Sequence, residues 1–99
     1  MPTYETTRRF DRDFAALSAD QKAAFREAVA KFVGDIESGI FRKGLRVKRI
    51  QGTKGVYEMT WSMGELDGRA TFMYGPPQLR DEPHIIWRRC GSHRIFDEP

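Results

Sequence analysis

The spacing of the apolar residues changes once along this chain of 99 residues, and that change limits the folds open to it. Up to about residue 39 the apolar side chains recur every three or four positions, as in amphipathic helices. From Leu45 onward they alternate with polar side chains, as in strands that bury one face. The sequence therefore predicts an α+β fold in which two N-terminal helices pack on a small, mainly antiparallel β-sheet.

A short strand and a short helix are expected first. Residues 4–7 are β-prone, and Phe10, Phe14 and Leu17 follow at positions i, i+4 and i+7. This spacing places the three apolar side chains on one face of a helix.

A second, longer helix is expected to begin after Ser18. Ser18 and Gln21 have the spacing of a capping box, in which each side chain bonds the backbone N–H of the other residue. The helix is expected to run to about Ser38 and to stop at Gly39. Its apolar face consists of Phe25, Val29, Phe32, Val33 and Ile36.

Four strands are expected in the remainder of the chain. Their apolar residues are Leu45 and Val47, then Tyr57, Met59 and Trp61, then Ala70, Phe72 and Tyr74, and finally Ile85, Ile86 and Trp87. Glycines in residues 51–55 and 63–68 predict turns, and residues 75–83 are too rich in proline to continue a strand pair. Without a repeat or a linker, residues 1–99 are expected to form a single domain.

Composition narrows the class of protein. Hydrophobic residues make up 39% and aromatic residues 12%, so the chain is not disordered, and a chain this long buries roughly 65% of its unfolded surface. Cys90 is the single cysteine, which excludes an internal disulfide and a zinc site of several cysteines. No apolar leader or membrane-spanning stretch is present, and a reducing cytoplasm is the expected location.

Positive charge is concentrated in two places. Residues 42–54 contain six lysines and arginines and no acid, which suits either a solvated strand face or a phosphate-binding face. After the apolar run that ends at Trp87, the chain presents Arg88, Arg89, His93 and Arg94. The net charge of +3 with this local excess predicts binding to a polyanion.

Four segments resemble those of a known family. They are Leu45-Arg46-Val47-Lys48, Gly55-Val56-Tyr57-Glu58, Gly68-Arg69-Ala70-Thr71-Phe72-Met73-Tyr74 and Cys90-Gly91-Ser92-His93-Arg94. In this order, behind a strand and two helices, they make the chain from Tyr4 to Phe96 resemble the RelE/ParE superfamily of bacterial toxins. In the RelE and YoeB branches, the fold positions messenger RNA in the ribosomal A site and cleaves it without a metal ion.

The resemblance implies two catalytic residues, and a third residue is a candidate beside them. Arg69 matches the arginine that opens the penultimate strand and faces the scissile phosphate, and His93 matches a position after the last strand that is histidine in YoeB-like members. Glu58 stands where RelE-like members have lysines and is the candidate general base. The implied reaction is attack by the ribose 2′-OH on the adjacent phosphate, which leaves a 2′,3′-cyclic phosphate and a 5′-OH. Additional RNA-binding charge is expected from Arg46, Lys48, Arg49, Arg88, Arg89 and Arg94.

The resemblance also implies partners, and alternatives stay open. The expected partners are a cognate antitoxin, the ribosome and messenger RNA, with no cofactor and no metal. One alternative is a ParE-like inhibitor that binds DNA gyrase, and another is a RelE-fold protein that binds nucleic acid without cleaving it. By themselves, Arg69 is also typical of a surface cation and His93 of a turn histidine.

Overall fold

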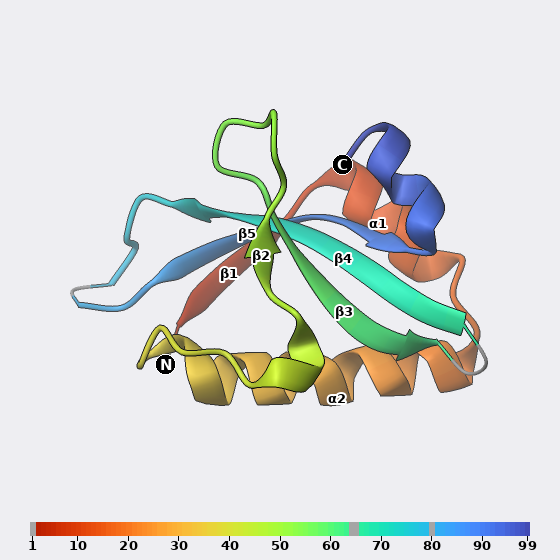
Figure 1. Cartoon of the computed structure of the whole chain (residues 1–99), viewed down its shortest axis with the longest axis horizontal. Helices are drawn as coiled ribbons and strands as arrows, with labels where there is room; N and C mark the ends of the chain where they lie inside the picture. The colour runs from red at the N-terminus through yellow and green to blue at the C-terminus, as the bar shows by residue number, and fades with distance from the viewer. Residues whose placement is uncertain (1, 64–65, 80) are drawn as a thin grey trace.

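A computed structural model of the protein describes residues 2–63, 66–79 and 81–99. These residues form an α+β fold, which confirms the predicted class, and none of their helices is both long and apolar enough to cross a membrane (Figure 1). The elements are β1 (Thr3–Thr6), α1 (Arg8–Ala15), α2 (Ala19–Ile36), the 3₁₀ helix η1 (Lys43–Leu45), β2 (Lys48–Arg49), β3 (Tyr57–Met63), β4 (Leu66–Gly75), β5 (His84–Gly91) and the 3₁₀ helix η2 (His93–Asp97).

The strands form one mixed sheet in the order β1-β5-β4-β3-β2. The pairs β2–β3, β3–β4 and β4–β5 are antiparallel. Strand β1 pairs in parallel with β5 and forms the edge of the sheet opposite β2. Helix α2 runs along one face of this sheet, and η2 lies on the other side at the end of β5 (Figure 1). The sheet is therefore packed by a long helix on one face only.

Helix α2 begins at the predicted capping box. The Ser18 N–H donates to Gln21 Oε1 at 2.9 Å, and the Gln21 N–H donates to Ser18 Oγ at 3.1 Å, so two otherwise unpaired donors are satisfied. The helix ends at Ile36, and Gly39 follows with φ of +72°, a conformation that favours glycine. The predicted helix and its stop are thus confirmed, with the end two residues earlier than expected.

Aromatic side chains from α2 and the sheet make the core. The Phe32 ring lies 5.0 Å from Phe72 and 5.2 Å from Trp87, and Phe25 contacts Trp61 with centroids 5.3 Å apart. All five of these residues are buried, as the alternation in the strands predicts. Ile86, which was expected to be buried beside Trp87, is only partly buried because it points to the opposite face of β5.

His84 ties β1 to β5. Its imidazole Nδ1 lies 2.7 Å from Thr3 Oγ1 and its Nε2 lies 3.0 Å from Glu5 Oε1, although 81 positions separate Thr3 from His84. The histidine is 4% exposed and is directly opposite Thr3 in the parallel pair. It is the first residue of β5, and its ring nitrogens lie within hydrogen-bond distance of Thr3 and Glu5 on β1.

The strand expected from Leu45 to Lys48 is mostly absent. Residues 43–45 form η1, Arg46 has φ of +46° in the left-handed region, and only Lys48–Arg49 pairs with β3. Leu45 is nevertheless 3% exposed, because the turn of η1 directs it into the core. Leu45 and Val47 have the spacing of a strand, but they pack on the core from an irregular segment.

Gly68 lies within β4 and not in a turn. The expected turn over residues 63–68 is shorter, since Met63 pairs with Leu66, and residues 64–65 lie outside the described residues. A Cβ at Gly68 would stand 2.5 Å from Cε2 of the Trp61 indole, which covers this position from the neighbouring strand. The glycine is required for close packing. The expected loop over residues 75–83 does connect β4 to β5, with Arg80 outside the described residues.

Asp35 near the end of α2 holds the segment that follows it. The Arg42 guanidinium donates from Nε to Asp35 Oδ2 at 2.8 Å and from Nη2 to Oδ1 at 2.9 Å, and the Arg42 N–H adds a third bond at 2.9 Å. These bonds favour the ionised carboxylate and lower the pKa of Asp35 from 3.8 to about 2.

The first prediction concerns Gly68. Gly68→Ala is expected to lower the free energy of unfolding by about 1–3 kcal/mol, because the added methyl group displaces the buried Trp61 indole. Urea unfolding followed by tryptophan fluorescence measures the difference. Gly44→Ala is the matched control, since no atom lies within 4 Å of a Cβ there. Equal losses in the two variants would contradict the assignment of close packing to Gly68.

The second prediction concerns the pH dependence at Asp35. Because the pKa is lowered on folding, this carboxylate contributes stability that is fully present above about pH 4 and is lost as the pH falls toward about 2. Arg42→Gln is expected to raise the pKa of Asp35 back toward 3.8, as measured by carboxyl-carbon NMR titration. Lys31→Gln on the same helix is the control, and an unchanged Asp35 pKa in Arg42→Gln would show that Arg42 does not cause the shift.

Candidate functional site

The face of the sheet turned away from α2 carries polar side chains. The register places Lys48 opposite Glu58, Glu58 opposite Thr71, and Thr71 opposite Arg89, so one row crosses four strands. Residues alternate between the faces of a strand, and those between the core residues of β3 and β4 therefore share this polar face. The polar face consists of Lys48, Glu58, Thr60, Arg69, Thr71, Met73 and Arg88.

Glu58 and Lys48 form an ion pair within this row. Lys48 Nζ lies 3.6 Å from Glu58 Oε1, with the lysine side chain 70% exposed and the glutamate side chain 12% exposed. Thr71, on the other side of Glu58, is fully buried, and its Oγ1 has no hydrogen-bond partner among the described residues. Glu58 is therefore a largely buried carboxylate with a cation on one side and a desolvated hydroxyl on the other.

Arg69 lies on β4, the middle strand of the sheet. It pairs with Thr60 on β3 and with Gly91 on β5, and its Nη1 donates to the Gly68 carbonyl at 3.1 Å. Because Thr60 is two residues from Glu58, Arg69 and Glu58 are diagonal neighbours on the same face, a spacing of about 7–8 Å that long side chains span. Two of the three predicted catalytic residues are thereby brought together.

His93 lies at the same end of the sheet as Arg69. It begins η2 two residues after Gly91, the residue opposite Arg69, and it is exposed. The imidazole meets the Phe96 ring edge-on, with centroids 4.9 Å apart. His93 also lines a hollow of about 500 Å³ together with Asp67, Ser92, Arg94, Phe96 and Asp97. The hollow is thus lined by acidic as well as basic side chains.

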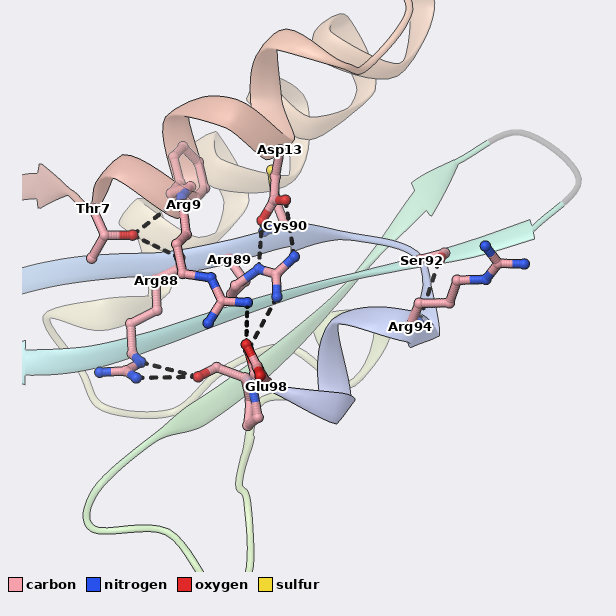
Figure 2. Close-up of polar contacts among 11 residues, drawn as sticks. Thr7, Arg9, Asp13, Arg88, Arg89, Cys90, Ser92, Arg94 and Glu98 are labelled. Atoms are coloured by element: carbon pink, nitrogen blue, oxygen red, sulfur yellow. Dashed lines mark hydrogen bonds and ion pairs between the residues drawn. The ribbon is translucent and has the colours of Figure 1, made fainter.

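Arg88 extends over the polar face from β5. Its Nη1 lies 3.6 Å from Met73 Sδ, and its Nε and Nη2 donate to the Pro99 carbonyl at 3.3 and 3.2 Å (Figure 2). The backbone carbonyl of Arg88 accepts from Thr7 Oγ1 at 2.8 Å, and Thr7 Oγ1 in turn accepts from the Phe10 N–H as the N-cap of α1. Arg88 is thus fixed by its backbone, while its guanidinium donates to Met73 Sδ and to the Pro99 oxygen.

Arg89 joins β5 to α1. Its Nε and Nη2 donate to the two carboxylate oxygens of Asp13 at 2.8 and 3.0 Å, and Asp13 also accepts the Cys90 N–H at 3.2 Å (Figure 2). The hydrogen bonds to Asp13 raise the pKa of Arg89 above its usual value. Both side chains are nearly buried, at 18% and 17% exposed. Arg89, predicted to bind RNA, therefore holds the helix as well, and its Nη1 turns to the Glu98 carbonyl at 3.2 Å.

The remaining cations predicted to bind RNA lie at two separate edges. Arg46, Lys48 and Arg49 are exposed at the β2 edge, where Arg49 Nη2 donates to the Thr53 carbonyl at 3.3 Å. Arg94 is exposed at the opposite side of the sheet, in η2. The predicted catalytic residues on β3 and β4 therefore lie between two groups of cations.

Sequence reasoning missed the contribution of α1. Arg9 and Asp13 are spaced four residues apart, beside the helix face that carries Phe10 and Phe14, and this spacing shows that the two polar residues share one face of the helix. It does not reveal that Asp13 meets Arg89, 76 positions along the chain, or that Arg9 Nη2 lies 2.6 Å from Glu98 Oε2. Only the pairing of β1 with β5 brings these residues together.

Cys90 belongs to the core. It is 1% exposed, and burial raises the pKa of its thiol to about 12, so the sulfur stays protonated at neutral pH. Cys90 is thus a small, buried, apolar side chain. In the described part of the chain, no group of three or more His, Cys, Asp or Glu side chains is placed to hold a metal ion.

Comparison with known proteins gives no relative. The sequence matches no protein-family model and has no significant match among curated proteins.

The third prediction concerns Asp13. Asp13→Asn is expected to lower the free energy of unfolding by about 1–3 kcal/mol, because it removes the charge that pairs with the nearly buried Arg89. Urea unfolding at neutral pH measures the loss. Glu27→Gln, an exposed change on α2, is the control and is expected to stay within about 0.5 kcal/mol of the parent. A loss at Asp13 no larger than this control would show that the ion pair does not hold α1.

Proposed function

We propose that this protein is the toxin of a bacterial type II toxin–antitoxin system and cleaves messenger RNA on the ribosome. The observation that carries the proposal is the juxtaposition on the polar face of Arg69 with its diagonal neighbour Glu58, with His93 at the same end of the sheet. Cations at the β2 edge and on β5 flank these residues on both sides. An RNA strand laid across the sheet meets positive charge before and after the reacting phosphate.

The proposed reaction is an internal transesterification. The ribose 2′-oxygen forms a bond to the adjacent phosphorus, and the bond from that phosphorus to the 5′-oxygen of the next nucleotide breaks. One proton leaves the 2′-OH and one is delivered to the 5′-oxygen. The products are a 2′,3′-cyclic phosphate and a 5′-OH.

The three side chains suit separate roles in this reaction. Glu58 is a carboxylate that takes the proton from the 2′-OH, and His93, when protonated, supplies a proton to the leaving oxygen. Arg69 binds the non-bridging oxygens, where charge accumulates in the transition state. Glu58 on β3, Arg69 on β4 and His93 just after β5 come from neighbouring strands, which lie about 4.8 Å apart, and this supports the assignment of base, cation and acid. Since side chains supply all three functions, the proposed chemistry uses no metal and no cofactor.

The proposal includes the setting in which such a protein works. Messenger RNA in the ribosome is the substrate, the cytoplasm is the location, and a cognate antitoxin is the partner that blocks the site. A segment with acidic residues is suited to that role, because the β2 edge exposes Arg46, Lys48 and Arg49.

The fourth prediction tests the reaction by primer extension on a message translated in a reconstituted bacterial system. The parent protein is expected to break the message at ribosome-occupied codons. Arg69→Ala, His93→Ala and Glu58→Gln are each expected to slow cleavage by about 10²- to 10⁴-fold, because each removes charge or proton transfer from the transition state. Lys31→Ala on α2, behind the sheet, is expected to cleave at the parent rate.

The other outcomes separate the alternatives. Intact message with blocked DNA supercoiling in a gyrase assay would replace this proposal with a ParE-like activity. Intact message with salt-sensitive RNA binding would leave a binding protein without catalysis. Circular dichroism of each variant distinguishes lost chemistry from lost folding.

A further inference from the structure

Three arginines from two distant parts of the chain, α1 and β5, converge on residues 98–99. Arg9 of α1 forms an ion pair with the Glu98 carboxylate, with Nη2 and Oε2 2.6 Å apart. Arg88 donates twice to the Pro99 carbonyl, and Arg89 Nη1 donates to the Glu98 carbonyl (Figure 2). We call Arg9, Arg88 and Arg89 the arginine cluster, and residues 93–99 the strap.

The contacts that hold the end of the strap are weak ones. The Arg9 and Glu98 side chains are 51% and 70% exposed, and an ion pair this exposed contributes about 0–1 kcal/mol. The three bonds to the carbonyls measure 3.2–3.3 Å, longer than the usual 2.9–3.0 Å for N–H···O bonds. Residues 98–99 are therefore easily displaced from the cluster.

The rest of the strap is anchored. Ile95 is 4% exposed, and the Ser92 side chain caps η2 by accepting from the Arg94 N–H at 3.3 Å. Residues 98–99 can leave the cluster while η2, with His93, stays against β4 and β5. Displacement then uncovers the arginines without removing the candidate catalytic histidine.

A phosphate satisfies the cluster better than the strap does. Arg88 presents Nε and Nη2 side by side to a single oxygen of Pro99, whereas a phosphate offers a separate charged oxygen to each of these two donors. Arg89 keeps Nη1 for the ligand after Asp13 has taken Nε and Nη2. The cluster also adjoins the polar face, since Arg89 lies directly opposite Thr71.

We propose that the strap is an autoinhibitory segment whose Glu98 and Pro99 occupy a binding site for an RNA backbone phosphate, formed by Arg9, Arg88 and Arg89. RNA that enters the polar face displaces residues 98–99 and takes over the three arginines. This inference rests on the proposed function for the identity of the ligand. It adds Arg9, on a helix outside the sheet, to the residues that bind RNA, and it makes affinity depend on a segment of the protein itself.

The fifth prediction is tested by binding of a fluorescent, single-stranded, 2′-O-methylated RNA of about 12 nucleotides, followed by anisotropy over a series of salt concentrations. This probe has no free 2′-OH, so binding is measured without cleavage. A chain ending at Asp97 is expected to bind it about tenfold more tightly than the parent at about 50 mM salt. The slope of log affinity against log salt is expected to steepen by about 0.7, for the one phosphate that the cluster neutralises.

Matched variants distinguish an effect of the arginine cluster on binding from an effect of net charge and from an effect of misfolding. Glu27→Gln removes one negative charge on α2, behind the sheet, and is expected to leave binding near the parent value. Arg88→Gln in the shortened chain is expected to abolish most of the gain. Glu98→Gln in the full chain keeps the length and is expected to give part of the gain, so the test does not depend on folding of the shortened chain.

Three results would overturn the inference. They are equal binding by the parent, the shortened chain and Glu98→Gln, a gain no larger than that of Glu27→Gln, and a gain that survives Arg88→Gln. The ribosome assay reports separately on the proposed function. If RNA binding depends on the strap but the message is not cleaved, the proposed reaction is refuted and the inference about the strap stands. If the message is cleaved but RNA binding does not depend on the strap, the inference about the strap is refuted and the proposed reaction stands.

Discussion

Phe32 of α2 is 1% exposed, and its ring packs against those of Phe72 and Trp87 on two neighbouring strands. This contact fixes which face of the sheet is apolar. Because strand residues alternate between faces, it also fixes that Arg69 and Glu58 point the other way. The chemistry of the polar face is thus a consequence of how one helix fills the core.

The polar face balances opposite charges. Glu58 is nearly buried beside Lys48, and Arg89 is nearly buried beside Asp13, so each charge that loses water gains a partner. Pairing of this kind keeps long side chains in place before a ligand arrives. Arg46, Arg49 and Arg94 lie outside these two pairs and are exposed.

The sequence predicts most of the regular structure and only part of the site. Periodicity and the capping box at Ser18 identify α2 because these signals are local, and burial of Trp61 follows from alternation in β3. The left-handed turn at Arg46 leaves no local signal, so a strand was expected where η1 lies. The joining of Asp13 to Arg89 depends on tertiary pairing across 76 positions, which no spacing rule encodes.

The parallel pairing of β1 with β5 has a consequence for synthesis of the chain. Thr3 contacts His84 across 81 positions, so β1 is translated roughly 4 to 16 s before its partner at 5–20 residues per second. Contacts this distant along the chain slow folding, because a long loop must close before they form. Strand β1 therefore cannot pair until β5 has been synthesised, and Arg9 cannot complete the arginine cluster until Glu98 has been synthesised.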